Sequence, residues 1–494
     1  MERWDTKFYV PTRHDGFYRR WAERTFGPAF HEEIADIISK NTKYNGHRKP
    51  ELLDPSTYSL VNYEESEKVE TDFRMLEEKA GQINDLLPAD MHDSFYHLVL
   101  FPVEASSIVN ELYFTSGKNA LYARQGRAAT NELAEKTEMI FRADTSLMGY
   151  YNRKYADGKW NHFMDQIHLG YKSWVDPSLN NLDALPCYRI QIPDAADMSI
   201  ALEGSEKVWP GADEPAVLPS FDVFNRQARY LEIFNKGSKT FSYSITCDKL
   251  WIILTDTVGS ISTEKRITVN IDWKKLPAGT QNGNLKIRGA GTDIKVSISA
   301  FNPVLQQSGV IRGFVEDDGC VSIEAEHYTL INNTKDRKWE KIEDYGRTLS
   351  GMRATTFTDA PSAVPGKNAP CLEYGMYLFS SGETGIRLIF SSTLNFLAGR
   401  DLKIGLSFDE EDPRIIVVVP KDFSAMNCNK VWEQTVKDNA RFIDLKAIIK
   451  AQGYHTLKIW LIDPGVVIEK IVVDTGGVRA SYLGPPESYR YFIR

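Results

Sequence analysis

The sequence is poor in cysteine, and its cysteines form no metal-binding pattern. The thiols stand far apart, with no CxxC pair and no Cys/His cluster, at Cys187, Cys247, Cys320, Cys371 and Cys428. A structural zinc ion needs several such ligands at close spacing, so the pattern gives a zinc site no support. We expect buried free thiols, while one disulfide among Cys320, Cys371 and Cys428 stays open if the protein is exported.

Long apolar runs and an excess of positive charge are also missing. No stretch of about 18 uninterrupted apolar residues occurs, so no transmembrane helix is predicted. The net charge is −8 and the pI is near 5.7. A nucleic acid or an anionic membrane would need a basic protein face, so both are disfavoured as partners. The charged start Met1–Asp5 lacks the apolar core of a secretory signal.

The composition is that of a globular protein, and the chain is longer than a domain with a single hydrophobic core. Of the 494 residues, 42% are hydrophobic and 26% are charged, which argues against long disorder or a fibrous protein. A single core stops growing beyond about 250–300 residues, so about two to four domains are expected.

The N-terminal third has helical periodicity. Apolar residues recur at helical spacing from Phe17 to about Tyr151, for example at Val69, Phe73, Leu76, Ala80 and Ile83. Gly27-Pro28 and Leu87-Pro88 interrupt the pattern, and Pro102 predicts a kink. After a short segment 1–27, residues 28–178 are therefore predicted to form an antiparallel helical bundle.

The rest of the chain has β character. Closely spaced prolines mark residues 179–220 as a connector. Short alternating runs such as Phe241–Ile245 then predict an immunoglobulin-like β-sandwich over 221–303. Residues 304–494 are predicted to form a jelly-roll β-sandwich with a helical insert at Phe442–Lys450. The predicted class is multidomain α + β.

Several long strings of uncommon residues carry a family resemblance. They are Tyr58–Tyr63, Gly117–Arg127, Gly158–Tyr171, Val321–Tyr328, Gly346–Thr348 and Val473–Ser488. In this order they resemble the helical and C-terminal domains of glycoside hydrolase family 115. The resemblance spans nearly the whole chain.

The resemblance implies a parent enzyme that removes 4-O-methylglucuronic or glucuronic acid side groups, linked α-1,2 to xylan, by an inverting mechanism. In the family an N-terminal domain and a (β/α)8 barrel precede this region, and the barrel supplies the acid and the base. Residues 1–27 resemble the stretch after the barrel, so the barrel itself is expected to be missing. The implied partners are glucuronoxylan or a xylo-oligosaccharide, the missing N-terminal catalytic half and a homodimer mate. The implied location of the parent is periplasmic or extracellular.

The chemistry of glycoside cleavage points the same way. An inverting enzyme holds two carboxyl groups about 6.5 to 9.5 Å apart across the scissile bond. In a barrel such groups sit at strand ends, and the sequence shows no alternation of strands and helices that would build them. We therefore predict no catalytic residue in this chain.

The densest polar segment of the helical region holds Trp160, Asn161, His162, Asp165 and His168. The spacing is not that of a zinc site, and hydrogen-bonded packing is the favoured interpretation. On a helix, His162 and Asp165 would share one face. The functional alternative, implied by the resemblance, is that the segment buttresses the sugar pocket from the helical side.

The string Gly117–Arg127 mixes glycines with basic residues but lacks the spacing of a phosphate-binding loop. A tight junction between helices is the stronger interpretation. Arg124, Gln125 and Arg127 are then candidates for pairing with carboxylates of a neighbouring domain.

The C-terminal module has the features of a sugar-binding jelly roll. Glu324 and Glu326 open it and are candidate ligands for a structural calcium ion. Candidates for stacking on pyranose rings are Trp339, Tyr345, Tyr374 and Trp432. The alternative is that these aromatic residues belong to the core.

Three functions remain open from the sequence. The leading hypothesis is an accessory portion of a glucuronoxylan-debranching enzyme that is inactive alone. The second is a noncatalytic carbohydrate-binding protein that uses the jelly roll. The third is a purely structural interaction module.

Overall fold

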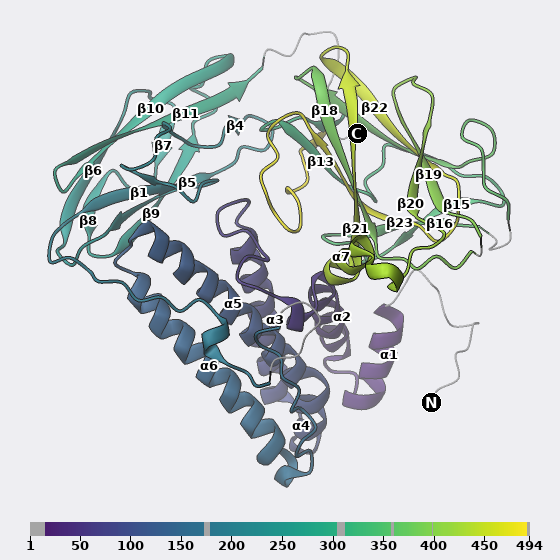
Figure 1. Ribbon diagram of the computed structural model, residues 1–494, viewed down its shortest axis with the longest axis horizontal. Helices are drawn as coiled ribbons and strands as arrows, with labels where there is room; N and C mark the ends of the chain where they lie inside the picture. Colours follow the sequence, from purple (N-terminus) through teal and green to yellow (C-terminus); the bar gives the residue numbers. More distant parts are fainter. Residues whose placement is uncertain (1–14, 172–177, 304–311, 357–359, 398, 492–494) are drawn as a thin grey trace.

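The computed structural model describes residues 15–171, 178–303, 312–356, 360–397 and 399–491. They form a helical region followed by two β modules (Figure 1). The predicted multidomain α + β class is confirmed. Among the described residues, no helix is long and apolar enough to cross a membrane.

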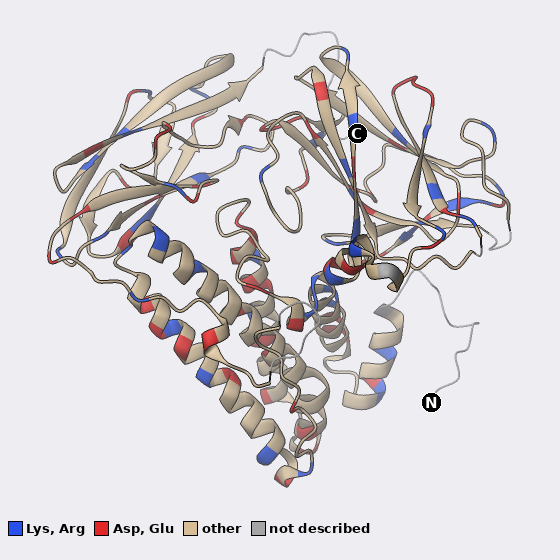
Figure 2. Cartoon of the chain, viewed as in Figure 1, with Lys and Arg blue, Asp and Glu red and all other residues tan. Residues whose placement is uncertain are grey.

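The helical region follows the predicted periodicity. Its α-helices are α1 (Asp15–Phe26), α2 (His31–His47), α3 (Glu65–Leu86), α4 (Ala89–Phe95), α5 (Phe101–Gln125) and α6 (Thr130–Arg153). Short 3-10 turns lie at Pro50–Leu52, Tyr155–Gly158 and Leu182–Ala184. The stripe Val69, Phe73, Leu76, Ala80 and Ile83 is buried on α3, as a one-sided apolar helix requires. Acidic and basic side chains are spread over this region (Figure 2).

The irregularity expected near Pro102 is a π-helical turn. This turn, Tyr96–Leu100, stands directly before α5, and Pro102 lies in the first turn of α5. The helical backbone is continuous from Ala89 to Gln125, so Pro102 leaves a carbonyl of the preceding turn without its N–H, and the π-helical turn accommodates the proline there. Gly126 ends α5 with a positive φ of 69°, a conformation that glycine adopts without strain.

The first β module begins earlier than the sequence indicated. Its sheets have the strand orders β2-β1-β5-β9-β7 and β3-β11-β10-β6-β8, and β4 pairs with β11. The bounds are β1 Met198–Leu202, β2 Val208–Trp209, β3 Ala216–Val217, β4 Phe221–Asp222, β5 Arg229–Asn235, β6 Phe241–Cys247, β7 Ile252–Leu254, β8 Val258–Ile261, β9 Glu264–Ile271, β10 Gly279–Gly289 and β11 Thr292–Asn302. Strands β1 to β3 lie inside the predicted connector 179–220, so that prediction was wrong for these residues. All five residues of β1 are buried, and packing outweighs the nearby prolines.

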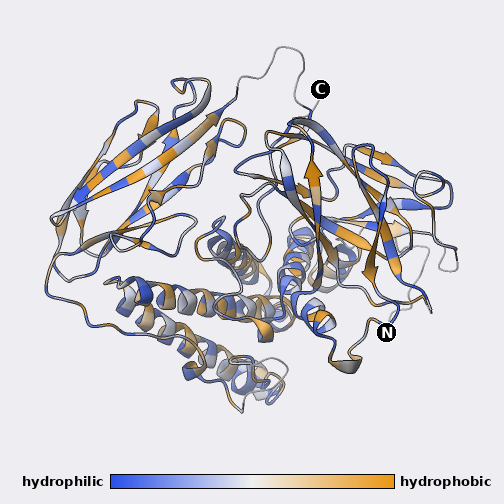
Figure 3. Ribbon diagram, turned by 45° about the horizontal axis from the view of Figure 1, so that its top comes forward, coloured by the Kyte–Doolittle hydropathy of each residue, from blue (hydrophilic) through white to orange (hydrophobic). Residues whose placement is uncertain are grey.

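The two sheets of the first module share one core. Met198 and Ile233 from one sheet pack in the same cluster as Ile245 and Ile287 from the other. Two sheets that bury their inner faces against each other form a sandwich. Figure 3 shows hydrophobic and hydrophilic residues alternating along these strands.

The second β module also consists of two sheets around one core. The orders are β20-β19-β22-β17-β12-β24, with β14 on β17, and β15-β16-β23-β18-β21, with β13 on β23. The bounds are β12 Gly313–Val315, β13 Cys320–Glu324, β14 Leu330–Asn332, β15 Lys338–Ile342, β16 Gly351–Thr355, β17 Cys371–Leu378, β18 Gly382–Ser391, β19 Leu402–Phe408, β20 Arg414–Val419, β21 Ala440–Ile449, β22 Gly453–Leu461, β23 Val467–Asp474 and β24 Arg490–Tyr491.

The helical insert predicted at Phe442–Lys450 is wrong. This stretch is strand β21, which pairs with β18 from Gly382↔Ile449 to Ser391↔Ala440. Alternate residues such as Ile443, Leu445 and Ala447 pack against the core, which is the period of a strand. The helix of this module is α7 (Lys430–Asp438), capped by the Asn429 side chain, which accepts a hydrogen bond from the Trp432 N–H.

Arg127 joins the helical region to the first β module. Its guanidinium is 2% exposed and lies 2.8 Å from Glu232 on β5 and 2.9 Å from Glu264 on β9. The same group lies over the Tyr122 and Phe234 rings. Arg124 pairs with Glu206 at 2.7 Å, and Gln125 donates to the Glu206 carbonyl. The predicted pairing with carboxylates of a neighbouring module is therefore confirmed for Arg124 and Arg127, whereas Gln125 contacts a backbone carbonyl there.

Replacing Arg127 tests this junction. Arg127→Met should lower the free energy of unfolding by about 3 kcal/mol, because it leaves two half-buried carboxylates without their cation. Arg124→Met, three residues away on an exposed pair, should change it by less than about 0.5 kcal/mol. Urea unfolding followed by circular dichroism measures both. Equal effects of the two variants would contradict the role of Arg127.

Candidate functional site

The predicted pocket buttress lies beyond the end of α6 and is not helical. His162 has a φ of 65°, in the left-handed region, so Trp160 to Asp165 forms turns rather than a helix. The expectation of a shared helix face is therefore wrong. The turns still bring His162 and Asp165 together, with 2.5 Å between Nδ1 and Oδ2. Both side chains are exposed, as is Asn161.

Trp160 is part of an aromatic cluster. Its ring stacks on His97 with 4.7 Å between centroids and meets Phe163 edge-on at 5.4 Å. The buried Tyr151 holds His97 through a hydrogen bond of 2.6 Å between its hydroxyl and Nδ1. Phe163 is 56% exposed, so the cluster presents an aromatic face to solvent.

His168 is anchored apart from this cluster. Its Nε2 lies 2.8 Å from Oδ1 of Asp144, a carboxylate on α6 that is 2% exposed. Burial alone would lower the pKa of His168, but the hydrogen bond and the charge of Asp144 outweigh it and raise the pKa above 6.5. Of the five predicted residues, Asn161, His162 and Asp165 are thus exposed and Trp160 is half-buried, whereas His168 is anchored to the buried Asp144.

The aromatic candidates of the C-terminal module differ in exposure. Trp339 is 2% exposed and Tyr374 is fully buried, both within the core. Trp432 is half-buried and packs against the same core. Burial excludes Trp339 and Tyr374 from stacking on a sugar, because no face of either ring is accessible. Tyr345 is 45% exposed, and its hydroxyl lies 3.0 Å from that of Ser391.

The calcium candidates are occupied by protein cations. Glu324 is buried on β13 and lies 2.8 Å from the ammonium of Lys470, which is 1% exposed. Glu326 pairs with Lys341 at 3.0 Å. A calcium ion would have to displace Lys470, so these residues do not fit the ion. Within the described ranges, no group of three or more His, Cys, Asp or Glu side chains could hold a metal ion. All five cysteines are free, but the expectation of burial holds only for Cys320 and Cys371, because Cys247 and Cys428 are exposed and Cys187 is half-buried.

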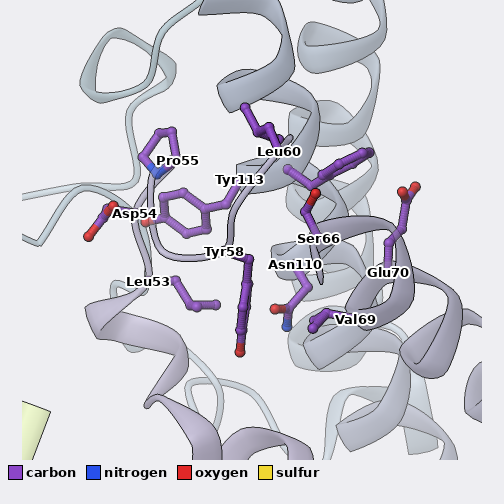
Figure 4. Close-up of a pocket in the computed structure, with 11 residues that line it drawn as sticks. Leu53, Asp54, Pro55, Tyr58, Leu60, Ser66, Val69, Glu70, Asn110 and Tyr113 are labelled. Carbon is purple, nitrogen blue, oxygen red and sulfur yellow. The ribbon is translucent and has the colours of Figure 1, made fainter. Parts of the chain in front are cut away.

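One small cavity lies between α3, α5 and the connector around Pro55 (Figure 4). Tyr58, Tyr113 and Asn110 point towards it, and its volume is about 20 Å³. The hydroxyl of Ser66 on its wall has no hydrogen-bond partner among the described residues. This space suits a single water molecule and is too small for a sugar ring.

The strings that carry the family resemblance meet at the interfaces between modules. The Tyr482 ring lies between the guanidinium groups of Arg347, at 4.1 Å, and Arg48, at 5.5 Å. It also meets Tyr58 edge-on at 5.5 Å. The Glu65 carboxylate on α3 accepts hydrogen bonds from the backbone N–H groups of Tyr482 and Leu483. These contacts seal the helical region against the second β module.

Asp318 joins the two β modules. Its carboxylate lies 3.2 Å from Arg229 on β5 and 2.6 Å from Arg479 in the segment after β23. Arg229 is also paired with Glu203 at 2.7 Å. Sequence reasoning missed Asp318, Glu65 and Glu203, because isolated acidic residues carry no local signal of a distant arginine.

Comparisons with known proteins support the resemblance. The family model of the glycosyl hydrolase family 115 C-terminal domain matches residues 313–487. The chain is similar to a solved family GH115 4-O-methyl-α-glucuronidase with specificity for decorated arabinogalactans, at 12% identity and a TM-score of 0.53. That likeness covers 95% of this chain and 42% of that chain, and it shows a shared fold.

Smaller solved modules resemble about a third of the chain. The C-terminal CBM6 of a laminarinase from Zobellia galactanivorans has 18% identity and a TM-score of 0.21, covering 31% of this chain and 98% of that one. A family 35 carbohydrate-binding module from Clostridium thermocellum has 12% identity and a TM-score of 0.21, covering 31% and 96%. None of the curated proteins matches the sequence.

The His168–Asp144 pair should make stability depend on pH. Because the pKa of His168 is raised in the folded state, its stabilisation is complete below 6.5 and is lost as the pH rises through the raised value. The thermal midpoint of the wild type relative to Asp144→Asn should therefore be constant at acidic pH and should fall as the pH rises above 6.5. His162→Gln, at an exposed pair, should keep the wild-type profile. A constant difference between wild type and Asp144→Asn would contradict the assignment.

Proposed function

We propose that this chain supplies the helical and β modules of an enzyme that removes (4-O-methyl)glucuronic acid side groups. The premise is the match of the chain to the C-terminal domain of glycoside hydrolase family 115. Cleavage would be performed by a catalytic region outside the described residues. The observation that carries this proposal is the fold likeness to a family GH115 enzyme, which covers 95% of this chain and 42% of that one.

The architecture supports an accessory role. Inverting glycosidases hold two carboxyl groups about 6.5 to 9.5 Å apart across a sugar. The described residues form a helical region and two modules of mostly antiparallel sheets, without alternating parallel strands and helices. The buried carboxylates of Glu324 and Glu232 are paired with Lys470 and Arg127, which leaves them unsuited to proton transfer.

The aromatic face beyond α6 supports contact with a catalytic region. Phe163 and His162 are exposed beside the stacked rings of Trp160 and His97. An exposed aromatic face on a rigid cluster is typical of a surface that another protein domain covers. We propose that this face packs near the sugar pocket of the parent enzyme.

The substrate and setting follow from the resemblance. We propose glucuronoxylan or a derived xylo-oligosaccharide as the polymer, and the solved enzyme named for decorated arabinogalactans makes that polymer the second choice. We further propose a periplasmic or extracellular setting and a homodimeric parent. Light scattering of the purified chain measures the oligomeric state.

The chain alone should release no glucuronic acid from glucuronoxylan or from decorated arabinogalactan, because its described residues form no (β/α)8 barrel to hold two opposed acids. Detection of the free acid by chromatography measures this. Clear turnover would overturn the accessory role. The alternative is a noncatalytic carbohydrate-binding protein, and affinity electrophoresis on xylans, with calcium and with a chelator, tests it. Retention of the chain on xylan would favour this alternative if the chain also gives no turnover when it is joined to a catalytic region.

The aromatic face can be tested where a family 115 catalytic region precedes this chain. Trp160→Ala and Phe163→Ala should each lower kcat/KM by about tenfold, since misplacing a wall of the pocket misorients the sugar. Leu250→Ala is the control, because Leu250 is 89% exposed on the first β module. Unchanged kinetics with unchanged thermal stability would remove this face from the proposal.

A further inference from the structure

A cavity of about 340 Å³ lies where α2 meets the second β module. This volume is at the lower end of the range for small-molecule sites. Residues Ser39, Thr42, Lys43, Gly46 and His47 line it from one face of α2, at spacings of three and four residues. Tyr345, Arg347, Ser391 and Glu469 line the opposite wall.

Lys43 places a largely buried ammonium group in this cavity. Its Nζ donates to the carbonyl oxygens of Leu349 at 2.9 Å and Thr348 at 3.3 Å. The nearest carboxylate, that of Asp344, lies 3.8 Å away and is 82% exposed at the rim. Burial lowers the pKa of Lys43, and nearby acidic groups oppose the shift without cancelling it.

Arg347 supplies a second buried cation. Its guanidinium donates to the carbonyl oxygens of Tyr482 and Asp438, which are neutral acceptors. Both cations act on the side chain of His47, which lines the cavity. Burial is the largest cause that lowers the pKa of His47 to about 3, and the charges of Arg347 and Lys43 are the next largest. The two buried charges that line the cavity are therefore positive, whereas its charged carboxylates, Glu343 and Asp344, are exposed to solvent.

His47 and Glu469 are the neutral polar groups of the interior. The imidazole is uncharged at neutral pH, and its inaccessible Nε2 has no hydrogen-bond partner among the described residues. Such a buried ring nitrogen is costly unless a ligand or water meets it. Burial also raises the pKa of Glu469 to about 8, despite the opposing charge of Arg347, so its carboxyl group is protonated and can donate.

We infer that this cavity binds a small hydroxylated carboxylate, such as a sugar acid, between α2 and the second β module. Lys43 meets the carboxylate, and the carboxyl group of Glu469 donates a hydrogen bond to one of its oxygen atoms. The hydroxyls of Tyr345 and Ser391, which are 3.0 Å apart, meet the ligand hydroxyls. The site stands on its own geometry and does not depend on the proposed enzyme function.

Calorimetric titration of the purified chain with D-glucuronate and with D-glucose tests the inference. The two probes share a ring and differ in the carboxylate. Glucuronate should bind saturably and at least about tenfold more tightly, because only it pairs with Lys43. Equal binding of the two sugars would overturn the requirement for a carboxylate, and saturable binding of neither would overturn the site.

Variants of one helix provide matched controls. Lys43→Met should weaken glucuronate binding by at least about tenfold, whereas Lys40→Met, one turn away on an exposed pair with Asp36, should not change it. Tyr345→Phe keeps the ring and removes the hydroxyl, so it should weaken binding even if Lys43→Met folds poorly. Wild-type affinity in both site variants would contradict the proposal.

The pH dependence gives an independent readout. Glu469 faces Lys43, Arg347 and Glu324, and Glu324 is paired with Lys470. Above about pH 8 Glu469 ionises and repels an anion, so glucuronate affinity should fall. Glu469→Gln cannot ionise and should flatten this part of the profile. Identical profiles for wild type and Glu469→Gln would overturn the place of Glu469 in the site.

Discussion

The buried carboxylate of Glu65 is the constraint on which the arrangement of the modules depends. It accepts hydrogen bonds from the backbone N–H groups of Ser59, Tyr482 and Leu483, at 2.7, 3.0 and 2.5 Å. Burial raises the pKa of Glu65, and these three hydrogen bonds oppose the shift. One side chain on α3 thus fixes the segment that follows β23, which lies among the three bodies in Figure 1. The Tyr482 ring can then fill the space between Arg48 and Arg347.

The family resemblance and the module interfaces involve the same residues. Tyr58 and Tyr482 meet across one interface, and Arg127 and Glu264 meet across another. Buried arginines tolerate few substitutes, because removing the cation strands a carboxylate in a poorly solvated site. Several of these residues stand in the strings that carry the resemblance, where their contacts are between modules. A resemblance built on them therefore reports how the modules pack.

Much of the fold could be predicted from periodicity, and the failures have physical causes. The apolar stripe on α3 fits the period of a helix only. The apolar residues of Ala440–Ile449 fit the period of a helix and that of a strand, and only the pairing with β18 makes this segment a strand. The strings around Arg127 correctly predicted contacts with another module. The burial of Trp339 could not be predicted, because the residue type alone does not distinguish an aromatic side chain in a core from one that stacks on a sugar. Lys43, His47 and Glu469 were missed, because the two walls of their cavity come from opposite ends of the chain.

The salt bridges at Asp318 complete a closed circuit of contacts. The helical region is attached to the first β module through Arg127, that module to the second through Arg229 and Asp318, and the second back to the helices through Glu65. In an open chain of bodies, one hinge is enough for a swinging motion. In a circuit, turning any body strains two attachments at once. The distance between the aromatic face beyond α6 and the cavity beside α2 is thereby fixed, so the chain acts as a rigid bracket.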